Sequence, residues 1–460
     1  MTSTRGAALA LDAADPLAPL RDAFVLPPEA IYLDGNSLGA LPKATAARVR
    51  AVVEGEWGEG LIRSWNARGK SAGWIGLPQR IADQIAPLIG AGPGQVMVGD
   101  STSVNLYKVL SAALALARLD APQRSVILSE HSNFPTDLYI AETLASAHGF
   151  ELRTVAADEL EAALDERVAV LLLTHVNYRS GRLHDMAGLT RAAHAQGALA
   201  VWVLAHSAGA VPLALLADEA DFAIGCGYKY LNGGPGAPAF LWAHPRHTER
   251  MDRDQLRQPL SGWFGHVAPF EFGPAYRPAP GIARFACGPP PVLSLAALEC
   301  GLATFEAAAP LGGMSALRAK SIALTELFIE RVESRCAGHG LSLASPREAA
   351  RRGSQASFAH DHAWPVMQAL IEHGVIGDFR AGYVAPPAPG TAPPPAGVRA
   401  GLGRPGARPA PTDAAHLLRF GFTPLYTRFV DAWDAAEALA AVLESNPWRE
   451  PRFNRRAAVT

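Results

Sequence analysis

One lysine set between two tyrosines is the residue in this sequence best placed to act as a nucleophile. Lys229 lies in the stretch 221–236, a short apolar run that ends in small residues and is followed by glycines and a proline. The glycines and proline prevent a helix or strand from following directly, so the lysine is expected on a loop at a strand end. In a water-poor pocket such an amine can lose its proton near neutral pH, as a Schiff-base nucleophile must. Taken alone, Lys229 is equally well interpreted as a surface lysine on a turn.

Hydroxyl and aromatic side chains follow two earlier strands. Ser101, Thr102 and Ser103 precede a helix, whose free backbone N–H groups and flanking hydroxyls suit a phosphate. The alternative is simple capping of the helix by Ser101 or Thr102. Phe134 and Asp137 follow the next strand, where an aromatic ring could stack on a planar cofactor or pack in the core.

Polar residues also follow the next two strands. A cluster that would be costly to bury unpaired stands directly against the apolar run 168–175 and is expected to line a wet cleft: His175, Asn177, Tyr178 and Arg179. His206 follows the next strand, one strand before Lys229. His206 and Lys229 can therefore reach the same rim of a sheet.

The elements that must position these residues form an alternation of strands and helices. The predicted strands are 95–98, 125–129, 151–155, 168–175, 198–204, 222–225 and 239–243. Several are continuously apolar, as expected when helices cover both faces of a sheet. This pattern predicts an α/β fold with a mostly parallel sheet of seven strands, whose ligand lies at the carboxyl ends of the strands.

The flanking segments predict two further units around this sheet. We expect an arm without strong periodicity over 1–40, helices over 43–55, 80–89, 292–308, 314–336 and 427–445, a loop over 61–78, and a strand-like pattern over 417–426. Proline and glycine dominate 382–412, which predicts an extended surface loop. The predicted domains are 1–60, an arm and helix that pack with the small domain, 61–300, the large α/β domain, and 301–460, a smaller α+β domain.

The composition narrows the possible partners. Apolar residues make up 49% and charged residues 18%, with a formal net charge of −2 and no dense basic run. A small-molecule partner is therefore favoured over nucleic acid. The four cysteines are far apart without metal-ligand spacing, which indicates reduced thiols in a cytoplasmic protein and no metal site. The sequence is interpreted as having neither a signal peptide nor an apolar run of about 20 residues that could cross a membrane.

Seven motifs in order resemble the kynureninase family, and the resemblance covers nearly the whole chain. They are YLDGNSLG at 32–39, EHSNFPTD at 130–137, THVNY at 174–178, LAHSAG at 204–209, GYKYLN at 227–232, GWFGH at 262–266 and RFGFTPLY at 419–426. The family consists of pyridoxal 5'-phosphate (PLP) enzymes of fold type I, in class V of the aminotransferase superfamily. The resemblance implies that fold and that cofactor.

The resemblance also implies a role for individual residues. Lys229 would form the Schiff base, with Tyr228 and His206 as further catalytic residues. The cofactor-binding residues would be Thr102, Ser103, Phe134, Asp137, Thr174, Val203, His206, Tyr228, Lys229, Trp263 and Pro289, with Trp263 reaching the phosphate from the partner subunit of a homodimer. The substrate-binding residues would be Arg419, whose planar guanidinium suits a carboxylate, and Asn36, Ser37 and Trp74.

The reaction implied by the resemblance is hydrolysis of L-kynurenine, or its 3-hydroxy form, to anthranilate, or its 3-hydroxy form, and L-alanine. Lys229 would take the Cα proton, and the Cβ–Cγ bond would break after water adds to the γ-carbonyl. The activity would belong to tryptophan catabolism and NAD biosynthesis.

Two positions depart from the family pattern. Val203 stands where the family carries an aspartate that pairs with the pyridine nitrogen, and Pro289 stands where bacterial relatives typically carry a threonine. Two alternatives therefore accompany an active kynureninase: a divergent PLP enzyme acting on a related amino acid, and a non-catalytic assembly subunit. The retained lysine argues against the subunit, because a site without chemistry has no use for a buried amine.

Overall fold

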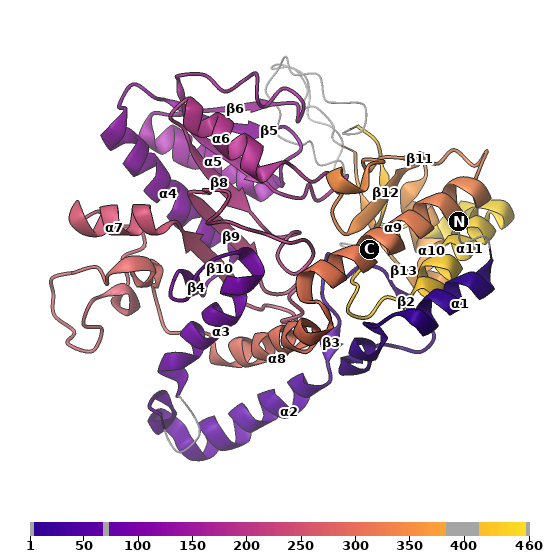
Figure 1. The fold of residues 1–460 in the computed structure, drawn as a ribbon, viewed down its shortest axis with the longest axis horizontal. Helices are drawn as coiled ribbons and strands as arrows, with labels where there is room; N and C mark the ends of the chain where they lie inside the picture. The colour runs from indigo at the N-terminus through magenta and orange to yellow at the C-terminus, as the bar shows by residue number, and fades with distance from the viewer. Residues whose placement is uncertain (1–3, 68–72, 383–413, 457–460) are drawn as a thin grey trace.

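The chain is built around two sheets, which a computed structural model describes over residues 4–67, 73–382 and 414–456 (Figure 1). The larger sheet has seven strands in the order β4-β10-β9-β8-β7-β5-β6. Their bounds are β4 Val96–Val98, β5 Val126–Glu130, β6 Glu151–Val155, β7 Val168–Thr174, β8 Leu199–Val203, β9 Phe222–Cys226 and β10 Ala239–Ala243. Strand β10 is antiparallel to both of its neighbours, β4 and β9, and all other neighbouring strands run parallel. The predicted mostly parallel sheet is confirmed.

Helices cover both faces of this sheet, which explains why its strands are apolar throughout. All seven residues of β7 are buried. Along β7 and β8, side chains alternate between two clusters, with Leu172 and Val203 in one and Leu173 and Trp202 in the other. The helices around the sheet are α3 Leu77–Ile85, α4 Thr102–Asp120, α5 Pro135–His148, α6 Met186–Ala195, α7 Pro245–Arg253 and α8 Val292–Ala308.

The smaller sheet is antiparallel and has the strand order β11-β12-β15-β14. Its strands are β11 Ser342–Leu343, β12 Gln355–Ala359, β14 Asp378–Arg380 and β15 Leu417–Gly421, and the helices α9 Gly313–Arg335, α10 Ala363–Glu372 and α11 Phe429–Ser445 share a core with it. The predicted strand 417–426 is too long. It ends at Gly421, whose Cα lies so close to Asn36 that a Cβ would fall 2.1 Å from the amide oxygen, and a turn closed by Tyr426 N–H on Thr423 follows.

The amino-terminal segment is more regular than expected. Helix α1 (Arg5–Ala14) packs on α11, and the expectation of an arm without periodic structure missed it. Asp12 accepts hydrogen bonds from the backbone N–H groups of Phe429 and Val430, at 2.6 and 2.9 Å, and so caps α11 from another element. The chain then forms the short strands β1 Phe24–Val25, β2 Ile31–Tyr32 and β3 Leu41–Pro42; β2 pairs with β13 (Val375–Ile376) of the smaller unit.

Several predicted boundaries shift for identifiable reasons. The helix predicted over 43–55 is α2 (Ala44–Ala51), continued in π geometry as η2 (Val52–Gly60). The helix predicted over 80–89 starts earlier, at Leu77, because a proline is well tolerated in a first turn. Within the predicted loop 61–78, 3₁₀ turns form at η3 (Leu61–Trp65) and η4 (Trp74–Gly76). Apart from Gly382, the tract predicted at 382–412 lies outside the described residues.

Helix α8 is the one helix among the described residues that is long and apolar enough to be considered as a membrane span. The stretch Val292–Leu311 is long and apolar enough for a span by length and composition alone. Half of it is buried within the fold, and α8 packs against α2, α3 and α9. Such burial is characteristic of a core helix.

Candidate active site

Lys229 lies on the loop that follows β9, at the carboxyl end of the large sheet. The amino-terminal segment closes over this loop, because Gly39 donates its N–H to the carbonyl of Tyr228 at 2.8 Å. A side chain at position 39 would clash, since a Cβ there would lie 2.4 Å from the Lys229 carbonyl oxygen. Glycine is thus required at Gly39 for the two segments to approach this closely.

The amine of Lys229 meets the imidazole of His206. Lys229 Nζ lies 3.3 Å from His206 Nε2, and the loop after β8 brings the histidine there. Burial lowers the pKa of Lys229, and the positive charges of Arg419 and Arg380 lower it further. Burial likewise holds the pKa of His206 well below its usual value, with Lys229 adding to the effect. The sequence prediction that both residues reach one rim is confirmed.

A buried carboxyl group lies beside this pair. Thr174, the last residue of β7, donates from Oγ1 to Asp137 Oδ2 at 3.3 Å. Burial raises the pKa of Asp137 to about 7, although the bond from Thr174 and the charge of Lys229 oppose the rise. Val203 ends β8 as the register partner of Thr174, so the two side chains face the same side of the sheet.

An aromatic shelf borders the same region. Phe134 precedes α5, and its side chain is 40% exposed although the neighbouring Asn133 and Asp137 are buried. Tyr178 meets it edge to face, with ring centroids 5.2 Å apart. An exposed ring held at a strand end by a second ring is able to stack against a planar ligand.

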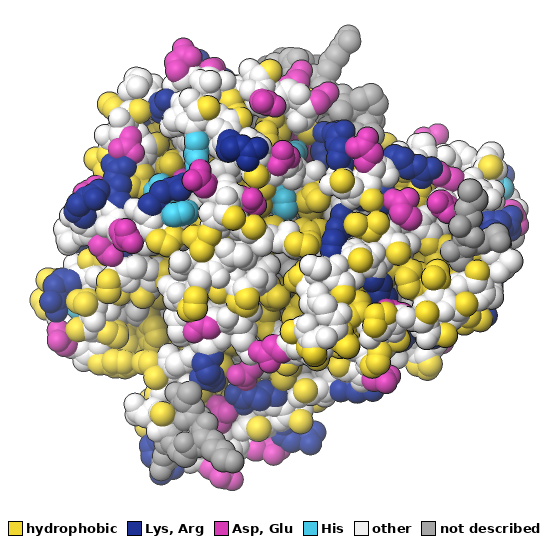
Figure 2. Space-filling model, in the orientation of Figure 1, with side chains coloured by type: hydrophobic (Ala, Val, Ile, Leu, Met, Phe, Trp, Pro, Cys, Tyr) yellow, Lys and Arg dark blue, Asp and Glu magenta, His cyan; other side chains and the backbone are white. Residues whose placement is uncertain are grey.

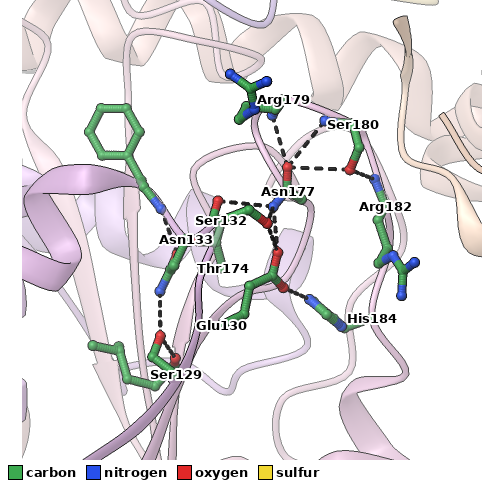
Figure 3. A network of polar contacts seen from close by, with 12 residues as sticks. Ser129, Glu130, Ser132, Asn133, Thr174, Asn177, Arg179, Ser180, Arg182 and His184 are labelled. Carbon is green, nitrogen blue, oxygen red and sulfur yellow. Dashed lines mark hydrogen bonds and ion pairs between the residues drawn. The ribbon is translucent and has the colours of Figure 1, made fainter. Parts of the chain in front are cut away.

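A buried polar network holds this shelf in place (Figure 3). Glu130 lies at its centre and accepts hydrogen bonds from Asn177 Nδ2 at 2.6 Å and from Ser132 Oγ, while His184 Nε2 lies 2.6 Å away. Burial opposes ionisation of Glu130, but His184, Ser132 and Asn177 together hold its pKa below the usual value. The network therefore fixes the loop that carries Tyr178.

Asn133 fixes the other ring of the shelf. Its Oδ1 accepts from the backbone N–H of Phe134 at 2.8 Å and also contacts Thr174 Oγ1, and its amide donates to Ser129 Oγ at 3.0 Å. Of the cluster predicted to line a wet cleft, His175, Asn177 and Arg179 are instead buried, and His175 is a structural residue. Its Nδ1 pairs with Ser207 at 3.1 Å, and burial lowers its pKa to about 3.

Two arginines, Arg419 and Arg380, place positive charge near Lys229 from the small sheet. Arg419, on β15, is almost fully buried and donates from Nη1 to the carbonyl of Tyr178 at 2.8 Å. Its Nη2 contacts Ser37 Oγ and Asp378 Oδ2. Asn36, which is also predicted to bind substrate, lies beside the same strand, with its side chain against Gly421.

The first turn of α4 supplies the hydroxyls predicted to hold a phosphate. Ser101 caps the helix by accepting from Val104 N–H at 3.3 Å, as the capping alternative expected. This leaves Thr102 and Ser103 as the first two helical residues, both partly exposed. Pro289 lines a cavity of about 390 Å³ together with Asp100, just before this turn.

Trp74 and Trp263 are connected to each other through two intervening aromatic rings. Their connection is a chain of ring contacts in which Trp74 meets Trp65 at 6.1 Å, Trp65 meets Phe264 at 5.9 Å, and Phe264 meets Trp263 at 4.7 Å. Within the described part of this chain, neither tryptophan has a recorded side-chain contact with Lys229 or Arg419. Their predicted roles in the site remain proposals.

Sequence reasoning missed four charged residues around the site. They are Asp34, Lys108, Asp378 and Arg380. Lys108 is fully buried in α4 and pairs with Asp100 at 2.6 Å, which fixes the turn before Thr102. A lysine in the middle of a mostly apolar helix was the available signal. Asp378 and Arg380 are two residues apart on the short strand β14, which places both side chains on one face of the sheet.

Comparison with known proteins places this geometry in a family. Kynureninase of Burkholderia pseudomallei is 52% identical over 460 residues, covering 99% of this chain and all of that protein. Kynureninase of Pseudomonas fluorescens is 50% identical over the full length of both chains. The chain belongs to the kynureninase family. Residues 317–393 also match the family described as Kynureninase C-terminal domain.

The kynureninase-family chain shares its fold with more distant solved structures. The cysteine desulfurase of Thermococcus onnurineus has a TM-score of 0.69 at 19% identity, covering 93% of this chain and 97% of that one. A cysteine desulfurase of Escherichia coli gives 0.67 at 18% identity, with 93% and 98% covered. These likenesses confirm the predicted fold type I.

Proposed function

We propose that this protein is a PLP-dependent hydrolase that cleaves the Cβ–Cγ bond of L-kynurenine, or of its 3-hydroxy form. The products are anthranilate, or its 3-hydroxy form, and L-alanine. The observation that carries this proposal is the buried contact of Lys229 with His206, facing an arginine pair, in a chain about half identical to kynureninases over its full length. The two alternatives, a divergent PLP enzyme and a non-catalytic subunit, are not favoured by that likeness.

The site fits the cofactor in three respects. The amine of Lys229 has a lowered pKa, as attack on an aldehyde requires. Phe134 presents a half-open ring for the pyridine face, and the amino end of α4 offers backbone N–H groups with Thr102 and Ser103 for the phosphate. Another solved neighbour, with a TM-score of 0.68, is described as having glycine covalently linked to its PLP cofactor. When bound, PLP supplies an electron sink for the bonds to Cα.

The residues of the chain divide the remaining work. Lys229 takes and returns the proton at Cα, because burial lowers the pKa of its amine and so favours the neutral form. Burial raises the pKa of Tyr228 above its usual value, so its hydroxyl keeps its proton and acts as a donor. His206 stays neutral and accepts or donates at Nε2 beside the lysine. Arg419, Asn36 and Ser37 form the carboxylate end of the substrate site.

The aromatic end of the substrate site is assigned to Trp74. Its indole N–H donates to Glu56 Oε2 at 2.6 Å, and it lines an apolar hollow with Trp57 and Ile62. We propose that this hollow and Trp263 meet the site of a second copy, so that each site is completed across a homodimer. The four free cysteines support a cytoplasmic protein.

The exposed apolar surface supports a homodimer. Phe272, Phe270 and Trp263 are 73%, 56% and 36% exposed, and their rings contact one another. Figure 2 shows hydrophobic side chains gathered at the left-hand edge of that view, over the segment between α7 and α8. Apolar patches of this kind on a soluble chain mark an interface.

The test of this function is direct. Purified protein loaded with PLP is expected to release fluorescent anthranilate from L-kynurenine, and Lys229→Ala is expected to abolish release and the visible absorbance of lysine-bound PLP. Bound cofactor without anthranilate release would favour the divergent enzyme. Failure to take up PLP would favour the non-catalytic subunit.

A further inference from the structure

One lysine is buried inside α4, a helix that is otherwise almost uncharged. Lys108 is fully buried, and the other charged residues of α4 are Arg118 and Asp120 at its far end. A buried ion pair seldom stabilises a fold more than well-packed apolar side chains of similar size would. Lys108 is therefore better explained by the segments that its ammonium holds in place than by stability.

The ammonium joins two segments that are far apart in sequence. Lys108 Nζ lies 2.6 Å from Asp100 Oδ2, in the turn between β4 and α4. It also donates to the carbonyl oxygen of Phe285, which ends a 3₁₀ turn. The first segment leads to Thr102 two residues later, and the second leads to Pro289 four residues later. Lys108 thus connects the turn that carries the proposed phosphate hydroxyls to the segment that contains Pro289.

The turn before α4 is held in an unusual conformation. Asp100 has a φ of 54°, in the left-handed region that favours glycine and costs other residues free energy. A second buried side chain of α4 also holds this turn, because Asn105 Nδ2 donates to the carbonyl of Gly99 at 3.0 Å. The turn therefore keeps its shape through polar contacts that α4 makes from within the core.

The same two segments also line one cavity. Gly99 and Asp100 from the turn, and Gly288 and Pro289 from the second segment, line the cavity of about 390 Å³ beside the start of α4. The side chain of Asp100 is 30% exposed, whereas that of Lys108 is fully buried. The ion pair therefore reaches from the core to the cavity wall, and it fixes the spacing of the two segments there.

We propose that Lys108 is a positioning residue for the cofactor phosphate, and that it acts through Asp100 and the Phe285 carbonyl rather than by a contact of its own. The inference rests on the phosphate site at Thr102 and Ser103, which is part of the proposed function. Backbone N–H groups at a helix start bind a phosphate well when they converge on it, so a displaced turn weakens several charge-assisted hydrogen bonds together. Lys108 thereby contributes to PLP affinity and not to the chemical step.

The test compares two aldehydes that differ only in the phosphate. PLP and pyridoxal are each titrated into the full-length protein freed of cofactor, and the absorbance of the aldehyde bound to Lys229 is followed. Lys108→Met is expected to weaken PLP about 10- to 100-fold and to leave pyridoxal within about twofold of wild type. With PLP at saturation, kcat for L-kynurenine should change by less than about threefold.

Matched variants separate this role from damage to the fold. Asp100→Asn removes the ion pair from its partly exposed side and should weaken PLP about three- to tenfold, and adding it to Lys108→Met should cost less than about twofold more. It decides the question if Lys108→Met does not fold. Lys320→Met breaks a comparably buried pair, with Asp15 at 2.7 Å, between α9 and the end of α1, and should change neither affinity.

Three results would overturn the proposal. One is PLP affinity within about twofold of wild type in both Lys108→Met and Asp100→Asn, and another is an equal loss for PLP and pyridoxal. The third is wild-type protein that binds PLP no more tightly than pyridoxal, which would also remove the proposed phosphate site. Tight binding of PLP without release of anthranilate would instead overturn the proposed hydrolase. The comparison of the two aldehydes would still stand, because it requires no turnover.

Discussion

Thr174 and Val203 are register partners at the carboxyl ends of β7 and β8, and the Thr174 hydroxyl donates to the buried carboxyl of Asp137. The end of β8 therefore carries an aliphatic side chain next to a carboxyl group supplied by α5. In the family resemblance, position 203 holds the aspartate that pairs with the pyridine nitrogen. Asp137 is the acid that the Thr174 hydroxyl connects to the ends of these two strands.

Restoring an acid at position 203 should raise turnover. We expect Val203→Asp to increase kcat for L-kynurenine by at least about tenfold, because a carboxylate there would keep the pyridine nitrogen protonated and the cofactor a better electron sink. The rate of anthranilate release measures it. Val203→Asn is the control, since it matches the shape without the charge. An unchanged rate in Val203→Asp would mean that another group, with Asp137 the first candidate, already does this work.

Removing the charge of Asp137 should stabilise the protein without cofactor above neutral pH. Its folded pKa, about 7, lies above the unfolded value, so the folded state holds a proton that the unfolded state releases. Stability is therefore lost as pH rises from about 4 to about 7 and is level beyond. Asp137→Asn lacks this loss and should gain about 2 to 4 kcal/mol at pH 8 and little at pH 4. Melting temperatures across that range check it, and a gain independent of pH would contradict it.

The network around Glu130 should be sensitive to a neutral replacement. Its pKa lies below the usual value, so its contribution to stability is full above the unfolded pKa and is lost as pH falls through the folded pKa. Glu130→Gln is expected to cost about 3 to 5 kcal/mol at pH 7, because it breaks a buried pair with His184, and less in acid. Glu333→Gln, in an exposed pair with Arg347, should cost less than about 1 kcal/mol. Equal losses in thermal melts would show that burial is unimportant here.

The exposed aromatic surface should control assembly. The double variant Phe270→Glu with Phe272→Glu places charges where a second copy would bury apolar rings, so we expect half the native mass by light scattering. Leu119→Glu, on an exposed residue of α4, is the control and should keep the native mass. A dimer that persists in the double variant would assign the interface to another surface.

Local patterns determined the large sheet and the position of its nucleophile. Strands β6 and β10 have the predicted bounds, and the other five differ by a residue or two, because continuous apolar runs between turn residues specify buried strands. Glycines and a proline after β9 placed Lys229 on a loop at the sheet edge, and the alternation of strands brought His206 to the same edge. These features depend on residues near one another in sequence.

Only the tertiary structure decided which charges surround that lysine. Helix α1 has little regular pattern of its own and is held by Asp12 capping α11, more than 400 residues later. The sequence predicted Arg419 near the substrate, but only the fold showed that Asp378, Ser37 and the Tyr178 carbonyl surround its guanidinium and that the more exposed Arg380 lies next to it. Hydrogen bonds of this kind join segments hundreds of residues apart, and whether a guanidinium is saturated or free depends on neighbours that no local pattern specifies.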